Sequence, residues 1–132
     1  MTKVLTIIIL FTATQAFSQT KLSDGSWEDK DLSFAIMQEE IKQKGYLELC
    51  IQKNGMCIDN LTIGFTIIIL DSAGKEIWSS LWTGKNMRIK FEKNFLGAEK
   101  VIVEAGAPFV INNLTGTRIK TGKRLRIEKL LK

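Results

Sequence analysis

The stretch Thr62-Ile-Gly-Phe-Thr-Ile-Ile-Ile-Leu70 is a nearly unbroken run of β-branched and aliphatic residues. Its length and composition are typical of a central strand buried on both faces rather than of a helix. The turn sequence Asp71-Ser-Ala-Gly74 follows, and Lys75–Trp82 then returns as a second strand. The two strands would form a β-hairpin, with Ile77 and Leu81 on the face that meets the core.

Short strand-like segments continue on both sides of this hairpin. Tyr46–Gln52 and Met87–Phe91 alternate apolar with polar residues, and Val101–Val103 and Phe109–Ile111 are short apolar runs. About seven short strands with turn residues every eight to twelve positions predict an all-β fold, an immunoglobulin-like β-sandwich. The residues predicted to form its core are Ile67, Ile69, Ile77, Leu81, Ile89, Phe91, Val101 and Val103.

The segment Asp31–Lys44 fits two different structures. Ser33 could cap a helix with an apolar face that includes Phe34 and Ile41. The alternation of Leu32, Phe34 and Ile36 fits a strand equally well, and the β character of the rest of the chain favours the strand.

The amino terminus has the organisation of a secretory signal peptide. Lys3 supplies a positive start, Val4–Phe11 an apolar run, and Ala16 and Ser18 the small residues that a signal peptidase requires. The run is far shorter than the roughly 20 residues that span a bilayer. We therefore expect cleavage before Gln19, or alternatively after Ala16.

Residues 1–18 are thus predicted to be a signal peptide, and residues 19–132 a single β-sandwich domain that is periplasmic or secreted. The chain is 45% hydrophobic and contains no histidine. The absence of histidine removes the commonest general base and the imidazole ligands of most catalytic zinc sites. No catalytic residues, metal or cofactor are predicted, and we do not expect an enzyme.

Cys50 and Cys57 are the only two cysteines. Asn54-Gly55 lies between them and is a strong signal for a two-residue hairpin turn, which would place Gln52 opposite Cys57. The two cysteines would then be diagonal neighbours on one face, within reach of a disulfide, as expected for an exported chain. The alternative is two buried free thiols.

Charge is unevenly distributed along the predicted domain. Residues 19–84 carry a net charge of −4 and residues 85–132 a net charge of +8. A final hairpin around Thr121-Gly-Lys123 would set like charges opposite one another, a small cost that a bound anion could relieve. The four residues of this predicted anion-binding face are Arg118, Lys120, Arg124 and Arg126.

This basic face suggests an anionic glycan or an acidic protein at the cell envelope as the partner. The alternative is a solvated edge strand whose charges prevent aggregation. Nucleic acid is not expected, because the patch lacks interleaved aromatic residues.

Trp78 and Trp82 lie four residues apart in a predicted strand and so share a face. If exposed, they would form an aromatic platform for a sugar ring or a protein. If buried, they are part of the core.

Two resemblances to known families add further expectations. Gly25-Ser26-Trp27, with Arg124 and Arg126 near the end, resembles the opening motif and closing arginine of lipocalins. That resemblance implies a closed barrel that carries a small ligand, with Trp27 packed beneath the barrel.

The hairpin Phe65–Trp78 resembles the central hairpin of immunoglobulin- and fibronectin-type modules. In particular, it is similar to small exported sandwich proteins of Bacteroides-like bacteria, whose function is unassigned. The resemblance implies that Asp71-Ser72-Ala73 could be an O-glycosylation acceptor, with Ser72 the modified residue. A plain β-turn explains the same three residues.

Together these features predict an exported, non-catalytic binding or accessory module with no membrane span after cleavage. The alternatives are a lipocalin-like carrier of a small ligand, or a small exported enzyme inhibitor that presents the Cys50–Cys57 loop.

Overall fold

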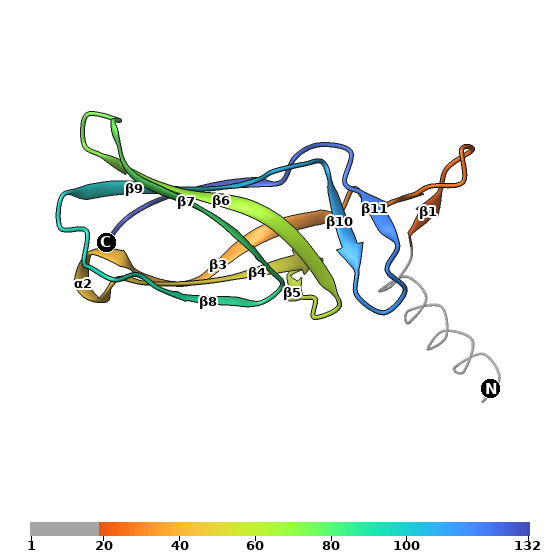
Figure 1. The fold of residues 1–132 in the computed structure, drawn as a ribbon, viewed down its shortest axis with the longest axis horizontal. Helices are drawn as coiled ribbons and strands as arrows, with labels where there is room; N and C mark the ends of the chain where they lie inside the picture. Colours follow the sequence, from red (N-terminus) through yellow and green to blue (C-terminus); the bar gives the residue numbers. More distant parts are fainter. Residues whose placement is uncertain (1–18) are drawn as a thin grey trace, which may run out of the picture.

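The computed structural model describes residues 19–132, and the predicted signal peptide lies outside this range. The described chain folds into two β-sheets that lie one over the other (Figure 1), with one helix of four residues. The all-β prediction is therefore confirmed. No helix within residues 19–132 is long and apolar enough to cross a membrane.

The larger sheet has eight strands and the smaller sheet four. The larger sheet contains β1 (Thr20–Lys21), β2 (Trp27–Glu28), β6 (Leu61–Asp71), β7 (Glu76–Gly84), β9 (Ala98–Ala105), β10 (Phe109–Asn112), β11 (Arg118–Lys120) and β12 (Arg126–Leu130). The smaller sheet contains β3 (Leu32–Glu40), β4 (Tyr46–Lys53), β5 (Met56–Cys57) and β8 (Met87–Lys90), and the helix is α2 (Ile41–Lys44). The strand count exceeds the predicted seven partly because β1, β2 and β5 are only two residues long.

Strand β6 is the centre of the larger sheet, as its composition predicts. It pairs with β7 on one side and with β9 and then β10 on the other. Phe65, Ile67 and Ile69 are buried, whereas Thr66 and Ile68 on the opposite face are only half-buried. The expected burial of both faces is wrong, because the second layer covers the sheet on one side only (Figure 1).

The β6–β7 hairpin forms at the predicted turn, but its second strand faces the other way. Ile69 pairs with Trp78 and Leu70 with Glu76, so Ile77 is the extra residue of a β-bulge. Ile77 and Leu81 are exposed, at 40% and 79%, and their assignment to the core is wrong. The indole rings of Trp78 and Trp82 take the inner face, where they bury more apolar area than the aliphatic side chains would.

A second, longer hairpin organises the carboxy-terminal third. The chain reverses between Asn112 and Thr117, where Asn112 N donates to Thr117 O and Gly116 N to Asn112 O, at 2.8 and 2.7 Å. Strand β11 then pairs with β10, and β12 with β9. The predicted final hairpin around residues 121–123 is therefore wrong.

The Thr121–Lys123 segment is an irregularity within the returning strand. Gly122 has a φ of 81°, and the Thr121 hydroxyl donates to Lys123 O. On either side the antiparallel bonding continues, since Thr121 N donates to Pro108 O and Ala105 N to Leu125 O. The glycine that suggested a chain reversal instead kinks one strand.

Leu32–Glu40 is a strand, as favoured from the sequence, and it ends in the short helix α2. A register shift between Ile36 and Gln38 explains why the alternation is incomplete. Gly45 ends α2 with a φ of 61°, and a Cβ atom built there would lie 2.7 Å from the carbonyl oxygen of Lys93. Only glycine fits this position without strain.

The core lies between the two sheets. Of the residues predicted to form it, Ile67, Ile69, Ile89, Phe91, Val101 and Val103 are buried. Glu39 is also buried, at 1% exposure, and its carboxylate accepts hydrogen bonds from Ile41 N and Lys132 N. This carboxylate ties the last residue of the chain to the end of β3.

The β4–β5 hairpin contains the predicted disulfide. Asn54 and Gly55 both have positive φ, as a type I′ turn requires, and Gln52 pairs with Cys57. Cys50 and Cys57 are bridged, with their Cα atoms 5.7 Å apart. Cys50 is buried and Cys57 is exposed.

We expect that replacing both cysteines (Cys50→Ala with Cys57→Ala) lowers the free energy of unfolding by about 2 kcal/mol, because the short loop is no longer closed in the unfolded chain. Urea denaturation measures this change. The reduced wild-type protein is the control and should unfold near the same urea concentration as the double variant. Equal stability of the oxidised and reduced wild-type proteins would contradict the prediction.

We expect Gly45→Ala to lower the free energy of unfolding by roughly 2–3 kcal/mol, because the left-handed backbone and the close Lys93 carbonyl both oppose a Cβ atom. Gly97→Ala is the matched control. A Cβ atom at Gly97 meets no atom within 4 Å, so the change should stay within about 0.5 kcal/mol. Equal effects of the two substitutions in urea denaturation would show that the Gly45 geometry is not restrictive.

Candidate functional site

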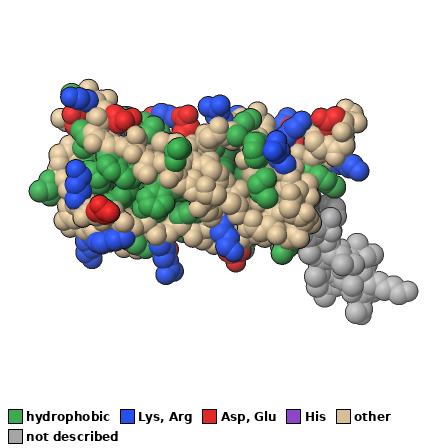
Figure 2. All heavy atoms as spheres, in the orientation of Figure 1, with side chains coloured by type: hydrophobic (Ala, Val, Ile, Leu, Met, Phe, Trp, Pro, Cys, Tyr) green, Lys and Arg blue, Asp and Glu red, His purple; other side chains and the backbone are tan. Residues whose placement is uncertain are grey.

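The candidate site is a groove on the side of the molecule where β7 and β8 form the edges of the two sheets. Among the described strands, β7 pairs only with β6, and β8 only with β4. The chain passes directly from β7 to β8, and so from one sheet to the other (Figure 1). Figure 2 shows hydrophobic side chains gathered on one face of the molecule, with charged side chains around them.

Three aromatic rings meet at the base of the groove, Trp78 from the wall formed by β7 and Phe91 and Phe95 from the opposite wall. The ring centroid of Trp78 lies 4.9 Å from that of Phe91 and 5.6 Å from that of Phe95, and the two phenylalanine centroids are 5.6 Å apart. Phe91 and Phe95 are buried, whereas Trp78 remains half-buried. Phe91 meets both Trp78 and Phe95 edge to face, the arrangement that aromatic side chains favour, whereas Trp78 and Phe95 are tilted by 53°.

A cavity of about 450 Å³ lies over these rings. We call it the aromatic groove, and its lining residues are Trp78, Trp82, Lys90, Phe91, Glu92, Lys93 and Phe95. A volume of this size is within the range of small-ligand sites.

The groove contains a polar atom that lacks a hydrogen-bond partner. Trp82 Nε1 is buried and has no acceptor among residues 19–132. Buried N–H groups are nearly always paired, and leaving one unpaired costs about 1–3 kcal/mol. Because this N–H is closed to solvent, an acceptor on a bound molecule can pair it only when a neighbouring side chain of the groove moves aside.

Charged side chains lie at the rim of the groove. The Lys93 ammonium lies over the Phe95 ring, 5.1 Å from its centroid. The Lys90 ammonium donates to the carbonyl oxygen of Lys44, and Glu92 lies between these two lysines in sequence. Two cations and one anion leave the rim with a net positive charge.

The segment that carries Phe91 and Phe95 is held in place by the α2 region. Phe91 N donates to Gly45 O at 2.8 Å, and Asn94 Nδ2 donates to Gln43 O at 3.0 Å. The close approach that only Gly45 permits therefore also positions the base of the groove.

The structure brings together Trp78 and Trp82, the residues of the predicted aromatic platform. They form one wall of the groove rather than a flat exposed surface, and they also pack against the core. The opposite wall was not predicted from the sequence. The signal for it was the interleaving of lysine and phenylalanine in Lys90-Phe-Glu-Lys-Asn-Phe95.

The four basic residues of the predicted anion-binding face do not oppose one another. The guanidinium of Arg118 lies 4.2 Å from the centroid of the Phe109 ring, and the ammonium of Lys120 lies 3.3 Å from an Asp24 carboxylate oxygen. Arg124 is exposed beside the kink at Gly122. The repulsion between facing basic residues, from which the anion site was predicted, is therefore not present.

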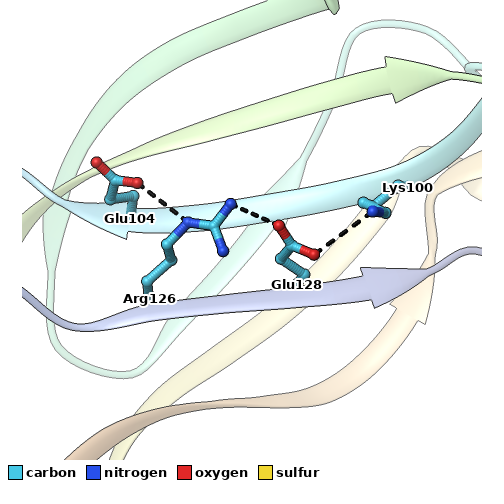
Figure 3. Close-up of polar contacts among 4 residues, drawn as sticks. All are labelled: Lys100, Glu104, Arg126 and Glu128. Carbon is cyan, nitrogen blue, oxygen red and sulfur yellow. Dashed lines mark hydrogen bonds and ion pairs between the residues drawn. The ribbon is translucent and has the colours of Figure 1, made fainter. Parts of the chain in front are cut away.

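Arg126 belongs to a chain of alternating charges across β9 and β12 (Figure 3). It contacts Glu104 at 3.2 Å and Glu128 at 2.5 Å, and Glu128 also contacts Lys100 at 3.4 Å. The hydrogen bond from Arg126 lowers the pKa of Glu128, and the same bond raises the pKa of Arg126.

The ion pair between Lys120 and Asp24 likewise involves a carboxyl group with a lowered pKa. Hydrogen bonds from the Ser26 hydroxyl and backbone N–H, with Lys120 nearby, lower the pKa of Asp24 to about 2. Asp24 therefore remains ionised opposite Lys120 under all but strongly acidic conditions.

The remaining predicted positions lie away from the groove. Ser72 is exposed in the β6–β7 turn. Trp27 lies in β2, opposite Ile119 of β11, and the cation over its ring is Lys21, at 5.9 Å, rather than Arg124 or Arg126. The lipocalin-like arrangement is therefore not formed by these residues. No group of three or more potential metal ligands occurs within residues 19–132.

Comparison with known proteins does not place the chain in a family, since no protein-family model, no curated protein and no solved structure matches it.

Proposed function

We propose that residues 19–132 are an exported, non-catalytic binding module and that the aromatic groove is its ligand site. The observation that carries this proposal is the unpaired indole N–H of Trp82 beside an aromatic base and a cationic rim. An aromatic surface with a few convergent polar groups is the usual composition of a ligand site. The export signal in the sequence supports a role in the periplasm or outside the cell.

The chemistry of the groove favours an anionic saccharide. The C–H face of a sugar ring can pack on the half-buried Trp78 ring. A sugar hydroxyl can accept from Trp82 Nε1 once a groove side chain moves aside to expose that atom. A carboxylate or sulfate group would then meet the ammonium groups of Lys90 and Lys93 at the rim. The proposed partner is still the anionic glycan expected from the charge distribution, but its proposed site is the aromatic groove instead of the predicted anion-binding face.

The other expectations have weaker support. Lys120 and Arg126 already pair with carboxylates, which a bound anion would have to displace. Lys90 and Lys93 contact only a backbone carbonyl and a ring, which carry no negative charge. An inhibitor that presents the disulfide hairpin remains a proposal supported by the exposed tip at Met56 and Cys57. For the fold, we propose that the two sheets are a variant of the immunoglobulin-like sandwich, supported by the central β6–β7 hairpin.

The proposal can be tested by calorimetric titration of the mature protein with a heparin-derived hexasaccharide at 0.1 M salt. We expect Lys90→Gln with Lys93→Gln to weaken binding at least tenfold, because two rim charges are lost. The matched control, Lys123→Gln with Arg124→Gln, removes two exposed charges from the segment between β11 and β12 and should change the affinity less than twofold. The opposite ranking would place the anion site at that segment.

A second variant tests the indole group directly. Trp82→Phe removes the unpaired N–H and keeps an aromatic ring, so we expect weaker hexasaccharide binding by a factor of about three to ten. Urea denaturation should show little loss of stability beyond that from the smaller ring, because no hydrogen bond within the described protein is broken. Unchanged affinity would remove Trp82 from the proposed site.

A further inference from the structure

The edge strands of the two sheets differ in how they are protected against pairing with another chain. An edge strand exposes unpaired backbone groups, and natural proteins block it with charges, bulges or short length. Most edges here follow this rule, through Arg88 and Lys90 on β8, Arg126, Glu128 and Lys129 on β12, a bulge near Met37 on β3, and a length of two residues in β1 and β5.

Strand β7 is the exception among the described edges. It is nine residues long, contains no proline, and has no charged residue after Glu76. Its bulge lies near its start, at Ile77, and leaves the seven residues Trp78–Gly84 in regular pairing with β6. The outer edge of this regular stretch pairs with no other strand within residues 19–132.

The outward face of the same stretch carries an exposed leucine. Leu81 is 79% exposed, and it lies at the middle of the seven residues, between Ser79 and Thr83. A long, uncharged edge with an exposed aliphatic residue at its centre is typical of a strand that pairs with another strand.

We propose that β7 pairs with β7 of a second copy of this chain, antiparallel and about a two-fold axis at Leu81. Pairing all seven regular residues of both copies requires this register, since Trp78 must then lie opposite Gly84 and Leu81 opposite itself. The two-fold axis then passes beside Leu81, so the same exposed apolar side chain of both copies meets there, as in an isologous interface.

Charge favours the same register. With the axis at Leu81, Lys85 of each copy lies opposite the bulge that contains Glu76 of the other copy. Opposite charges therefore meet at both ends of the paired stretch, which is stabilising. A different partner strand would gain nothing from this symmetry, so a second copy is the occupant that the sequence of β7 fits.

The pairing depends on no ligand and is independent of the proposed saccharide binding. It would join the two eight-stranded sheets into one. Because the aromatic groove opens beside β7, the grooves of the two copies would face a common axis, and a polymeric ligand could contact both.

A cysteine substitution tests the register. Two Leu81→Cys side chains would lie directly opposite each other, within reach of a disulfide, so mild oxidation should convert most of the protein to a covalent dimer on a non-reducing gel. Thr83→Cys is the matched control on the same exposed face. In the proposed register its two sulfur atoms are four positions apart along the strands, roughly 13 Å, and should cross-link at least fivefold less.

A charge substitution tests the association itself. Sedimentation equilibrium of the mature wild-type protein should show a dimer in the micromolar range, and Leu81→Lys should raise the dissociation constant at least tenfold. Leu114→Lys is the control, because Leu114 is 80% exposed in the turn between β10 and β11, and it should leave the dimer unchanged. A wild-type monomer at every concentration, or equal cross-linking of the two cysteine variants, would overturn the proposal, whether or not the saccharide binds.

Discussion

The bulge at Ile77 determines how side chains are arranged on the side of the molecule where β7 and β8 are the sheet edges. Side chains alternate along a strand, so one extra residue exchanges the two faces of everything that follows it. After the bulge, Trp78 and Trp82 point toward the smaller sheet and Leu81 points to solvent. The same local irregularity therefore supplies the aromatic wall of the groove and the apolar residue on the outer face of β7.

The sequence predicted best what short-range signals determine. The type I′ turn at Asn54-Gly55 determines the register of β4 and β5 and thereby brings Cys50 and Cys57 together. The composition of β6 predicted a central strand, since few positions outside a sheet interior accept so many β-branched residues. The faces of β7 could not be predicted in this way, because a bulge depends on pairing with β6 and leaves no mark in the alternation.

The error in the carboxy-terminal hairpin has a related cause. Both Asn112–Thr117 and Thr121–Lys123 contain a glycine with positive φ, and the sequence does not show which one reverses the chain. The answer depends on the long-range pairing of β12 with β9, which requires the chain to keep its direction through the kink at Gly122. Charge counts along the sequence mislead for the same reason, because Arg126 meets acidic residues of β9 and β12 in space rather than the basic residues near it in sequence. Of the aromatic groove, only Trp78 and Trp82 were predicted. The interleaved lysines and phenylalanines of residues 90–95 were a signal for the other wall, but its position depends on long-range packing against Gly45.

The gap between the two sheets is closed differently along its two long edges. On one side, β12 and β3 are adjacent, and the buried Glu39 carboxylate binds the backbone of Lys132, so the edges are held by the chain itself. On the other side, the chain crosses between the sheets after Gly84, and the space between β7 and β8 holds aromatic rings instead of another strand. A protein that needed only to be stable could have placed charges along β7 as well, as it does on β8 and β12. The uncharged edge of β7 and the unpaired Trp82 N–H lie on this same side, so the polar groups without a partner gather where the chain does not close the structure itself.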